Sequence, residues 1–175
     1  MGNVSSGLAL IDQEYGAVGG EDSTDRSWAS YKLQQTIRTM TPAALAATVA
    51  GTFVLGSPRV ATNPYGGNSV TTQFRVVGLR AVFPGGVTAD STNFKVLTVN
   101  RYPSAGTTAT AVAVMSTTPA SSGTVVIGQC VNFTITAANA VLDQNGSLVL
   151  IVGSSGDGVS LPAGTVVEAD LIPVV

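Results

Sequence analysis

The sequence predicts an all-β protein, an antiparallel jelly-roll β-sandwich of about eight strands with an N-terminal arm and one or two short helices. Three observations lead to this fold class. The chain of 175 residues is rich in Val and Thr, whose branched Cβ atoms favour strands. It carries 20 Gly and 8 Pro, which supply turns together with Ser and Asn. From about residue 52 onward, apolar residues recur with a period of two, as in half-buried strands.

The composition argues against several functions. The 8 Lys and Arg against 10 Asp and Glu give a net charge of −2, and no basic stripe exists that would follow nucleic-acid phosphates. Without His, there is no imidazole base or ligand. Cys130 alone forms neither an intrachain disulfide nor a thiolate zinc site, and we interpret it as a small buried or half-buried apolar residue. We therefore expect no enzyme activity, cofactor, metal or nucleic-acid partner.

No membrane segment is expected either. The most apolar window, residues 43–55, is shorter than the roughly 20 residues that a spanning helix needs. No secretory signal is visible, because the first 25 residues contain no Lys or Arg.

Two regions are expected along the chain, an arm with short helices over residues 1–50 and the sandwich over residues 51–175. Residues 1–25 contain half of the acids and several glycines, so this segment buries little apolar area and is expected to be extended when alone. These acids are Asp12, Glu14, Glu21, Asp22 and Asp25.

The signals from residue 26 to residue 49 favour helices. Leu33, Ile37 and Met40 lie at helical spacing, although residues 26–40 are ambiguous between helix and strand. Thr41–Pro42 is typical of a helix start and predicts a short helix over residues 43–49.

Apolar arm residues suggest a contact surface. The arm either packs on its own sandwich or presents these residues to a partner shell or a neighbouring subunit, where aromatic anchors dominate binding energies. The candidate partner-binding residues are Trp28, Tyr31, Leu33, Ile37 and Met40.

The remaining chain reads as short strands separated by turns, the pattern of a sandwich or barrel. A β-bulge is expected at Val76–Gly78, where the alternation changes face. The apolar run at residues 148–152 predicts a central strand, and Asn145–Gly146 predicts a tight turn. The expected strands are residues 52–61, 70–83, 93–102, 107–116, 124–128, 131–137, 147–153 and 165–172.

Residues 74–171 resemble the small jelly-roll proteins of tailed-phage heads, the capsid decoration and head-fibre proteins. The stretches that carry the resemblance are residues 76–83, 89–100, 147–158 and 161–166. The resemblance implies a homotrimer seated on the major capsid protein at the outer surface of a virion, made in the host cytoplasm, with the N-terminal segment as anchor.

Several acidic residues are candidates for a catalytic or metal site. Asp157, with Asp143 or Asp170, offers oxygen ligands for calcium, but the spacing fits no calcium loop and a glycine-rich turn is favoured. Paired carboxylates among Asp90, Asp143, Glu168 and Asp170 would suit glycoside hydrolysis, but a solvated strand face is favoured.

The leading hypothesis is a non-enzymatic capsid decoration protein that stabilises a phage head. One alternative is a receptor-binding or lectin-like module, in which Tyr65 and Tyr102, each beside Pro and turn residues, contact a glycan. A second alternative is a coat protein of a non-tailed virus.

Overall fold

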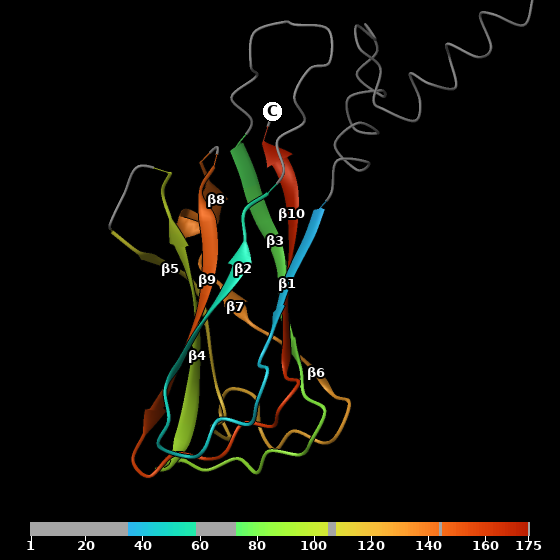
Figure 1. Cartoon of the computed structure of the whole chain (residues 1–175), viewed down its shortest axis with the longest axis vertical. Helices are drawn as coiled ribbons and strands as arrows, with labels where there is room; N and C mark the ends of the chain where they lie inside the picture. The colour runs from blue at the N-terminus through green and yellow to red at the C-terminus, as the bar shows by residue number, and fades with distance from the viewer. Residues whose placement is uncertain (1–34, 59–72, 105–107, 144, 175) are drawn as a thin grey trace, which may run out of the picture. The chain divides into compact units, whose positions relative to one another are not determined.

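The structure is a computed structural model that describes residues 35–58, 73–104, 108–143 and 145–174. Its strands form two antiparallel sheets that pack as a β-sandwich (Figure 1). This sandwich belongs to the unit Thr36–Val175, one of two units into which the chain divides.

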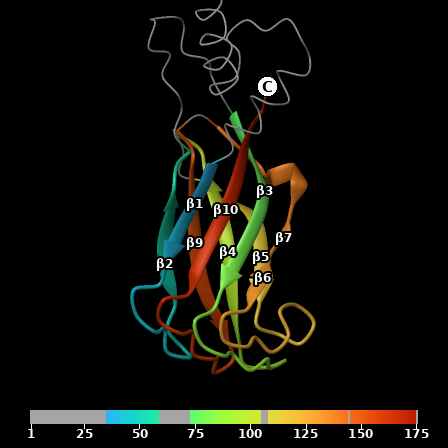
Figure 2. The same cartoon turned by 90° about the vertical axis from the view of Figure 1, so that its right-hand side faces the viewer.

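Each sheet contains five strands within the described residues. The first sheet, which faces the viewer in Figure 2, has the order β1 (Gln35–Met40), β10 (Val166–Val174), β3 (Gln73–Val82) and β6 (Cys130–Asn132), and β8 (Val141–Leu142) also pairs with β3. The second sheet has the order β2 (Gly51–Gly56), β9 (Ser147–Ser155), β4 (Phe94–Tyr102), β5 (Thr110–Ser116) and β7 (Thr134–Ile135).

The strand pairs are nested along the chain. The first strand β1 pairs with the last strand β10, β2 pairs with β9, β3 pairs with β6 and β8, and β4 pairs with β5. Successive pairs alternate between the two sheets. A long antiparallel hairpin wrapped into two sheets in this way is a jelly roll, so the predicted fold class is confirmed.

The core lies between the sheets and follows the period-two pattern. Along β10 every second residue is buried, with Val167, Ala169 and Leu171 inside. Strand β9 lies between β2 and β4, which confirms the central strand predicted for residues 148–152, and four of these five residues are buried while Ile151 is half-buried. The largest fully buried apolar side chains in the described residues are Phe83, Leu97, Met115, Leu142, Leu148, Leu150, Leu161 and Leu171.

The predicted β-bulge is present in β3. Gly78 pairs with Asp170 and Val76 pairs with Leu171, so Val77 has no partner on β10. The extra residue keeps Phe74 and Val76 on the core side, where the residues beyond the bulge also point. Val77 itself is 47% exposed and Leu79 is buried, so these two residues of β3 point to opposite faces.

The helix predictions are wrong wherever the structure describes them. Residues 35–40 form strand β1, because pairing with β10 buries one side of the strand, and only every second residue is exposed. Residues 43–49 form turns and an isolated bridge between Leu45 and Leu161. The Leu45 backbone bonds to Leu161 in both directions, and the one bond within the segment, from the Val49 N–H to the Ala46 carbonyl at 3.0 Å, closes a single turn rather than a helix. The one helix in the described residues is the 3-10 turn Ala137–Asn139.

Two strand predictions also need correction. Residues 124–128 contain one bridge, Val87 to Val125, followed by a turn, because Gly128 has a φ of +76° that ends extended pairing. Residues 131–137 divide between the sheets, with β6 on β3 and β7 on β5. The chain crosses over at the buried Phe133, and β8 was not predicted at all.

The start of the sandwich also differs from the expected arrangement. Strand β1 places residues 35–40 in the first sheet, ahead of the boundary expected at residue 51. Residues 1–34 lie outside the described residues. Across the described ranges, no helix has the length and apolar character needed to cross a membrane.

Candidate interaction surfaces

One end of the sandwich is built from four loops that we call the loop end, residues 41–50, 83–93, 117–129 and 156–165 (bottom of Figure 1). Backbone hydrogen bonds join these loops in pairs. Leu45 and Leu161 bond in both directions at 2.9 and 2.8 Å, and Val87 and Val125 do the same at 2.8 and 2.9 Å. The Asn93 side chain accepts a 2.8 Å bond from the Asp157 N–H and links the two pairs. Hydrogen bonds therefore connect all four loops of the loop end.

A buried lysine fixes the first of these loops. Lys95 on β4 is fully buried, and its Nζ donates to the carbonyls of Ala46 at 2.9 Å and Val49 at 2.5 Å, and to Ser154 Oγ at 2.8 Å. The three donors of the ammonium group are thereby satisfied. Burial lowers the pKa of Lys95 below its ordinary value. Ser154 Oγ in turn donates to the carbonyl of Ala47 at 2.9 Å, so residues 46–49 are held from two sides.

Two adjacent aliphatic residues project from the loop end. Val126 and Ile127 are 61% and 75% exposed. Their turn is held by the Gln129 side chain, which accepts from the Val126 N–H at 2.9 Å. The Gly128 N–H donates to the Phe83 carbonyl at 2.7 Å. Val126 and Ile127, which we call the apolar tip, are thus exposed on an ordered turn. Apolar residues exposed in this way are suited to contact another protein and do not contribute to the core.

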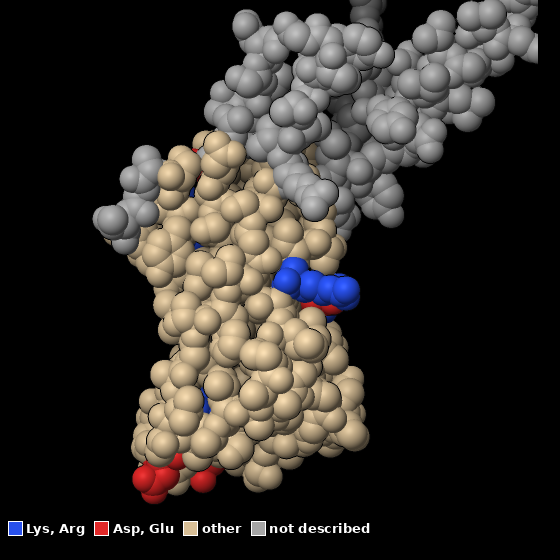
Figure 3. All heavy atoms as spheres, viewed as in Figure 1, with Lys and Arg blue, Asp and Glu red and all other residues tan. Residues whose placement is uncertain are grey.

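One acid of the loop end, Asp90, stabilises a turn. Asp90 Oδ1 accepts backbone bonds from Thr92 at 2.7 Å and Asn93 at 2.8 Å, and these bonds lower the pKa of Asp90. Acidic side chains gather at this end in Figure 3, and Asp90 and Asp157 are the acids of the four loops. Within the described ranges, no group of three or more Cys, Asp or Glu residues is arranged to hold a metal ion.

Glu168 and Asp170 are engaged in an ion-pair cluster on the outer face of the first sheet. Arg80 on β3 donates to Glu168 at 2.8 Å and to Asp170 at 3.1 Å, and Thr36 on β1 donates to Asp170 at 2.7 Å. The bonds and charges of both acids raise the pKa of Arg80. The two carboxylates are therefore occupied by neighbours, and their side chains are only 19% and 18% exposed.

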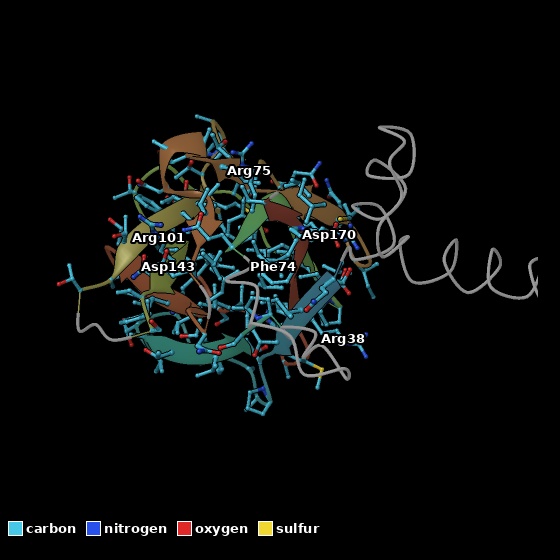
Figure 4. The ribbon with its side chains drawn as sticks, turned by 90° about the horizontal axis from the view of Figure 1, so that it is seen from above. Arg38, Phe74, Arg75, Arg101, Asp143 and Asp170 are labelled. Atoms are coloured by element: carbon cyan, nitrogen blue, oxygen red, sulfur yellow. The ribbon has the colours of Figure 1, made fainter. Side chains whose placement is uncertain are left out.

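A pocket of about 210 Å³ lies at the opposite end of the sandwich. Leu142 and Pro103 supply apolar surface, and five polar or aromatic residues complete the lining. Figure 4 shows Arg101 and Asp143 side by side at this end, away from Asp170. The Arg101 guanidinium donates to the Val141 carbonyl, which ties β4 of one sheet to β8 of the other. The remaining lining residues are Tyr102, Thr108 and Thr110.

The structure gives mixed outcomes for the residues singled out in the sequence. Trp28, Tyr31, Leu33 and Tyr65 lie outside the described residues. Ile37 packs against the protein's own core, because alternate residues of β1 face inward. Met40 is 57% exposed and so is available to a partner. Tyr102 lines the pocket with Asp143. Cys130 is exposed, which contradicts its interpretation as a buried apolar residue.

Sequence reasoning missed the roles of Lys95, Arg80 and Arg101. For Lys95 the signal was available, because it shares period-two parity with Leu97 and Val99, which are both fully buried. The apolar tip was missed because Val125, Val126 and Ile127 together were assigned to a strand. The partners of Arg80 depend on the register of β3 against β10, which no local pattern specifies.

Comparisons with known proteins give limited information. No protein-family model and no curated protein matches the sequence. Among solved structures, a chain of Desmodium yellow mottle tymovirus is similar over 81% of this chain and 80% of that chain, with 12% sequence identity and a TM-score of 0.31. A proposal of function therefore rests on the residues and topology of this chain.

Proposed function

We propose that the protein is a non-enzymatic virion structural protein that decorates the outer surface of a bacteriophage head and stabilises the shell. The observation that carries the proposal is the nested jelly-roll strand order, a fold that recurs in viral capsid domains and in lectins. The sequence stretches that resemble phage-head decoration proteins fall mainly on β3, β4, β9 and the approach to β10, which are central strands of the two sheets.

The non-enzymatic part of the proposal is supported by the state of the acids. Glycoside hydrolysis requires two carboxylates free to face a sugar from opposite sides. Glu168 and Asp170 share one cation, Arg80, and Asp90 accepts two backbone bonds of its own turn. Asp143 lies at the other end of the sandwich from Asp90, so these acids do not form a facing pair.

Attachment to the shell is proposed to use apolar residues from two sources. Trp28, Tyr31 and Leu33 precede the first strand, and aromatic anchors of this kind dominate interface energies. The ordered tip Val126–Ile127 supplies a second contact, and its high exposure favours an apolar socket on the major capsid protein. A homotrimer would repeat each weak contact three times and so gain avidity.

The test uses heads of the encoding virus assembled without this protein, mixed with the purified full-length chain. Co-sedimentation at saturable stoichiometry, with greater resistance of the heads to heating, is expected. A protein that remains in the supernatant at every concentration would overturn the decoration role. Closed shells formed by the chain alone, seen by electron microscopy, would favour the coat-protein alternative instead.

Two variants test whether Val126 and Ile127 contact the head. Replacing both tip residues, Val126→Ser with Ile127→Ser, is expected to weaken head binding by about tenfold or more, since each removes buried apolar area at the interface. The control is Val77→Ser, a residue 47% exposed at the bulge of β3 and away from the loop end. Equal binding by the tip variant and the control would remove the tip from the interface.

A further inference from the structure

The pocket opposite the loop end lies beside a turn at Gly146 that leaves little space for a side chain. Asn145 has a φ of +65°, and Gly146 follows it immediately before β9. A Cβ atom at Gly146 would lie 3.0 Å from the Asp143 carbonyl oxygen and 3.1 Å from that of Tyr102. The Gly146 N–H also donates to the Asp143 carbonyl at 2.8 Å. This close approach holds Tyr102 and Asp143 next to each other at the pocket.

The polar side chains of the pocket make few hydrogen bonds within the described part of the protein. The Asp143 carboxylate has one weak contact, a 3.4 Å bond from Gln73 Nε2. Arg101 uses one of its amino groups on the Val141 carbonyl, so further N–H donors of the guanidinium remain. The hydroxyls of Thr108 and Thr110 have no hydrogen-bond partner among the described residues. Donors and acceptors therefore converge on one small space beside an aromatic ring.

The chemistry of this lining indicates its ligand class. An anion such as phosphate would meet the Asp143 carboxylate together with a single guanidinium, and a metal ion would find only one carboxylate and a cation. A saccharide instead offers hydroxyl groups that both donate and accept, and C–H faces that pack on an aromatic ring and on apolar surface. The volume of about 210 Å³ lies below the range of drug-sized ligand sites and suits a single ring.

We propose that this pocket binds one sugar ring of a neutral glycan. In this site Asp143 accepts hydrogen bonds from sugar hydroxyls, Arg101 donates to them, and Tyr102 with Pro103 contacts the apolar face of the ring. The proposal goes beyond shell decoration, because it gives the protein an adhesive function at the end of the sandwich opposite the loop end. It does not depend on attachment to a head.

The test is saturation-transfer NMR on the full-length protein with glucose, galactose, rhamnose and N-acetylglucosamine at millimolar concentration. At least one sugar is expected to receive saturation from the protein, with a dissociation constant of order 1 mM. Tyr102→Ala is expected to weaken that binding by about tenfold, because the ring contact is lost. Asp143→Asn is expected to weaken it as well while preserving the shape of the side chain.

The controls separate loss of the site from loss of the fold. Tyr102→Phe retains the ring and should retain most of the binding. Asp157→Asn, on an exposed acid of the loop end, should bind as the unmodified protein does, and far-UV circular dichroism shows whether each variant is folded. Glycine and inorganic phosphate serve as zwitterionic and anionic probes. The proposal is overturned if no sugar binds, if only glycine or phosphate binds, or if sugar binding survives both Tyr102→Ala and Asp143→Asn.

Discussion

Lys95 is the one charged residue that is buried among the described residues. Placing an ammonium group in the interior is costly unless hydrogen bonds replace its hydration shell. Here two carbonyls and one hydroxyl take that place, and no carboxylate pairs with it. Two of those acceptors are the carbonyls of residues 46 and 49. The burial of Lys95 is costly in desolvation energy, and its hydrogen bonds order the first loop of the loop end, residues 41–50.

Replacement of Lys95 tests whether its hydrogen bonds stabilise the protein. Lys95→Met keeps the length of the side chain and leaves three acceptors without their donor. Hydrogen bonds to a charged group contribute roughly 1.5–3 kcal/mol each, partly offset by the relief of a buried charge, so we expect unfolding free energy to fall by about 2 kcal/mol in urea titration. Ser154→Ala, which removes one acceptor, should cost about 1 kcal/mol. If the Lys95→Met protein is as stable as the original, the free energy of desolvating the ammonium group equals the stabilisation from its hydrogen bonds.

The same variant has a defined pH signature. Burial lowers the folded-state pKa of Lys95 below 10.5, so the unfolded chain binds more protons between the two pKa values. Stability then rises with pH across that window and is constant below it with respect to this group. The stability advantage of the original protein over Lys95→Met is therefore expected to grow as the pH approaches 10.5.

Strand β3 shows how one extra residue can leave a core unchanged. Without Val77, the residues Phe74, Val76 and Leu79 would fall on one face by simple alternation. The bulge absorbs the extra residue and leaves it exposed. Deletion of Val77 should therefore preserve every core position of β3 and change the unfolding free energy by less than about 1 kcal/mol.

A deletion two residues away is the matched control. Arg75 is also exposed, but its removal would turn Phe74, which is 3% exposed, toward solvent. Loss of a buried Phe costs about 3–5 kcal/mol, and urea titration of both deletions gives the comparison. Equal losses for the two deletions would mean that the bulge has a structural role of its own.

Elements with strong period-two patterns were predictable from the sequence, and elements fixed by distant partners were not. Strands β3, β4, β5, β9 and β10, the bulge and the Asn145–Gly146 turn follow from local alternation and turn chemistry. Strand β1 was read as a helix because Ile37 and Met40 also satisfy helical spacing, and only pairing with β10 decides between the two. The sequence names Tyr102 and Asp143 as separate candidates and predicts no pocket, because their approach depends on the packing of the turn at Gly146.

Across the whole sandwich, charge is divided unequally between the two sheets. The outer face of the first sheet carries Arg80, Glu168 and Asp170 together with other arginines. In the second sheet the only charged strand residues are Lys95, which is buried, and Arg101, which lines the pocket. A row of paired residues crosses its outer face without any charge: Thr52, Ile151, Thr98, Val114 and Thr134.

This uncharged face is where we expect copies of the chain to meet in the proposed homotrimer. Where this face of three copies meets around a threefold axis, the faces pack without desolvating an unpaired charge, which would otherwise oppose association. Val114, 46% exposed on β5, lies within the row. Val114→Lys should therefore bring a charge into the contact and convert the trimer to monomer, as measured by light scattering on the full-length chain over a dilution series.

Val77→Lys is the matched control, because Val77 is 47% exposed on the outer face of the first sheet. That variant should remain trimeric, and so should Trp28→Ala combined with Tyr31→Ala, since those residues are assigned to the shell. Loss of the trimer in the arm variant alone would make the arm the assembly element. A monomer in the unmodified protein at every dilution would remove trimeric avidity from the proposed attachment, and each copy would then have to hold the head through the tip and the arm by itself.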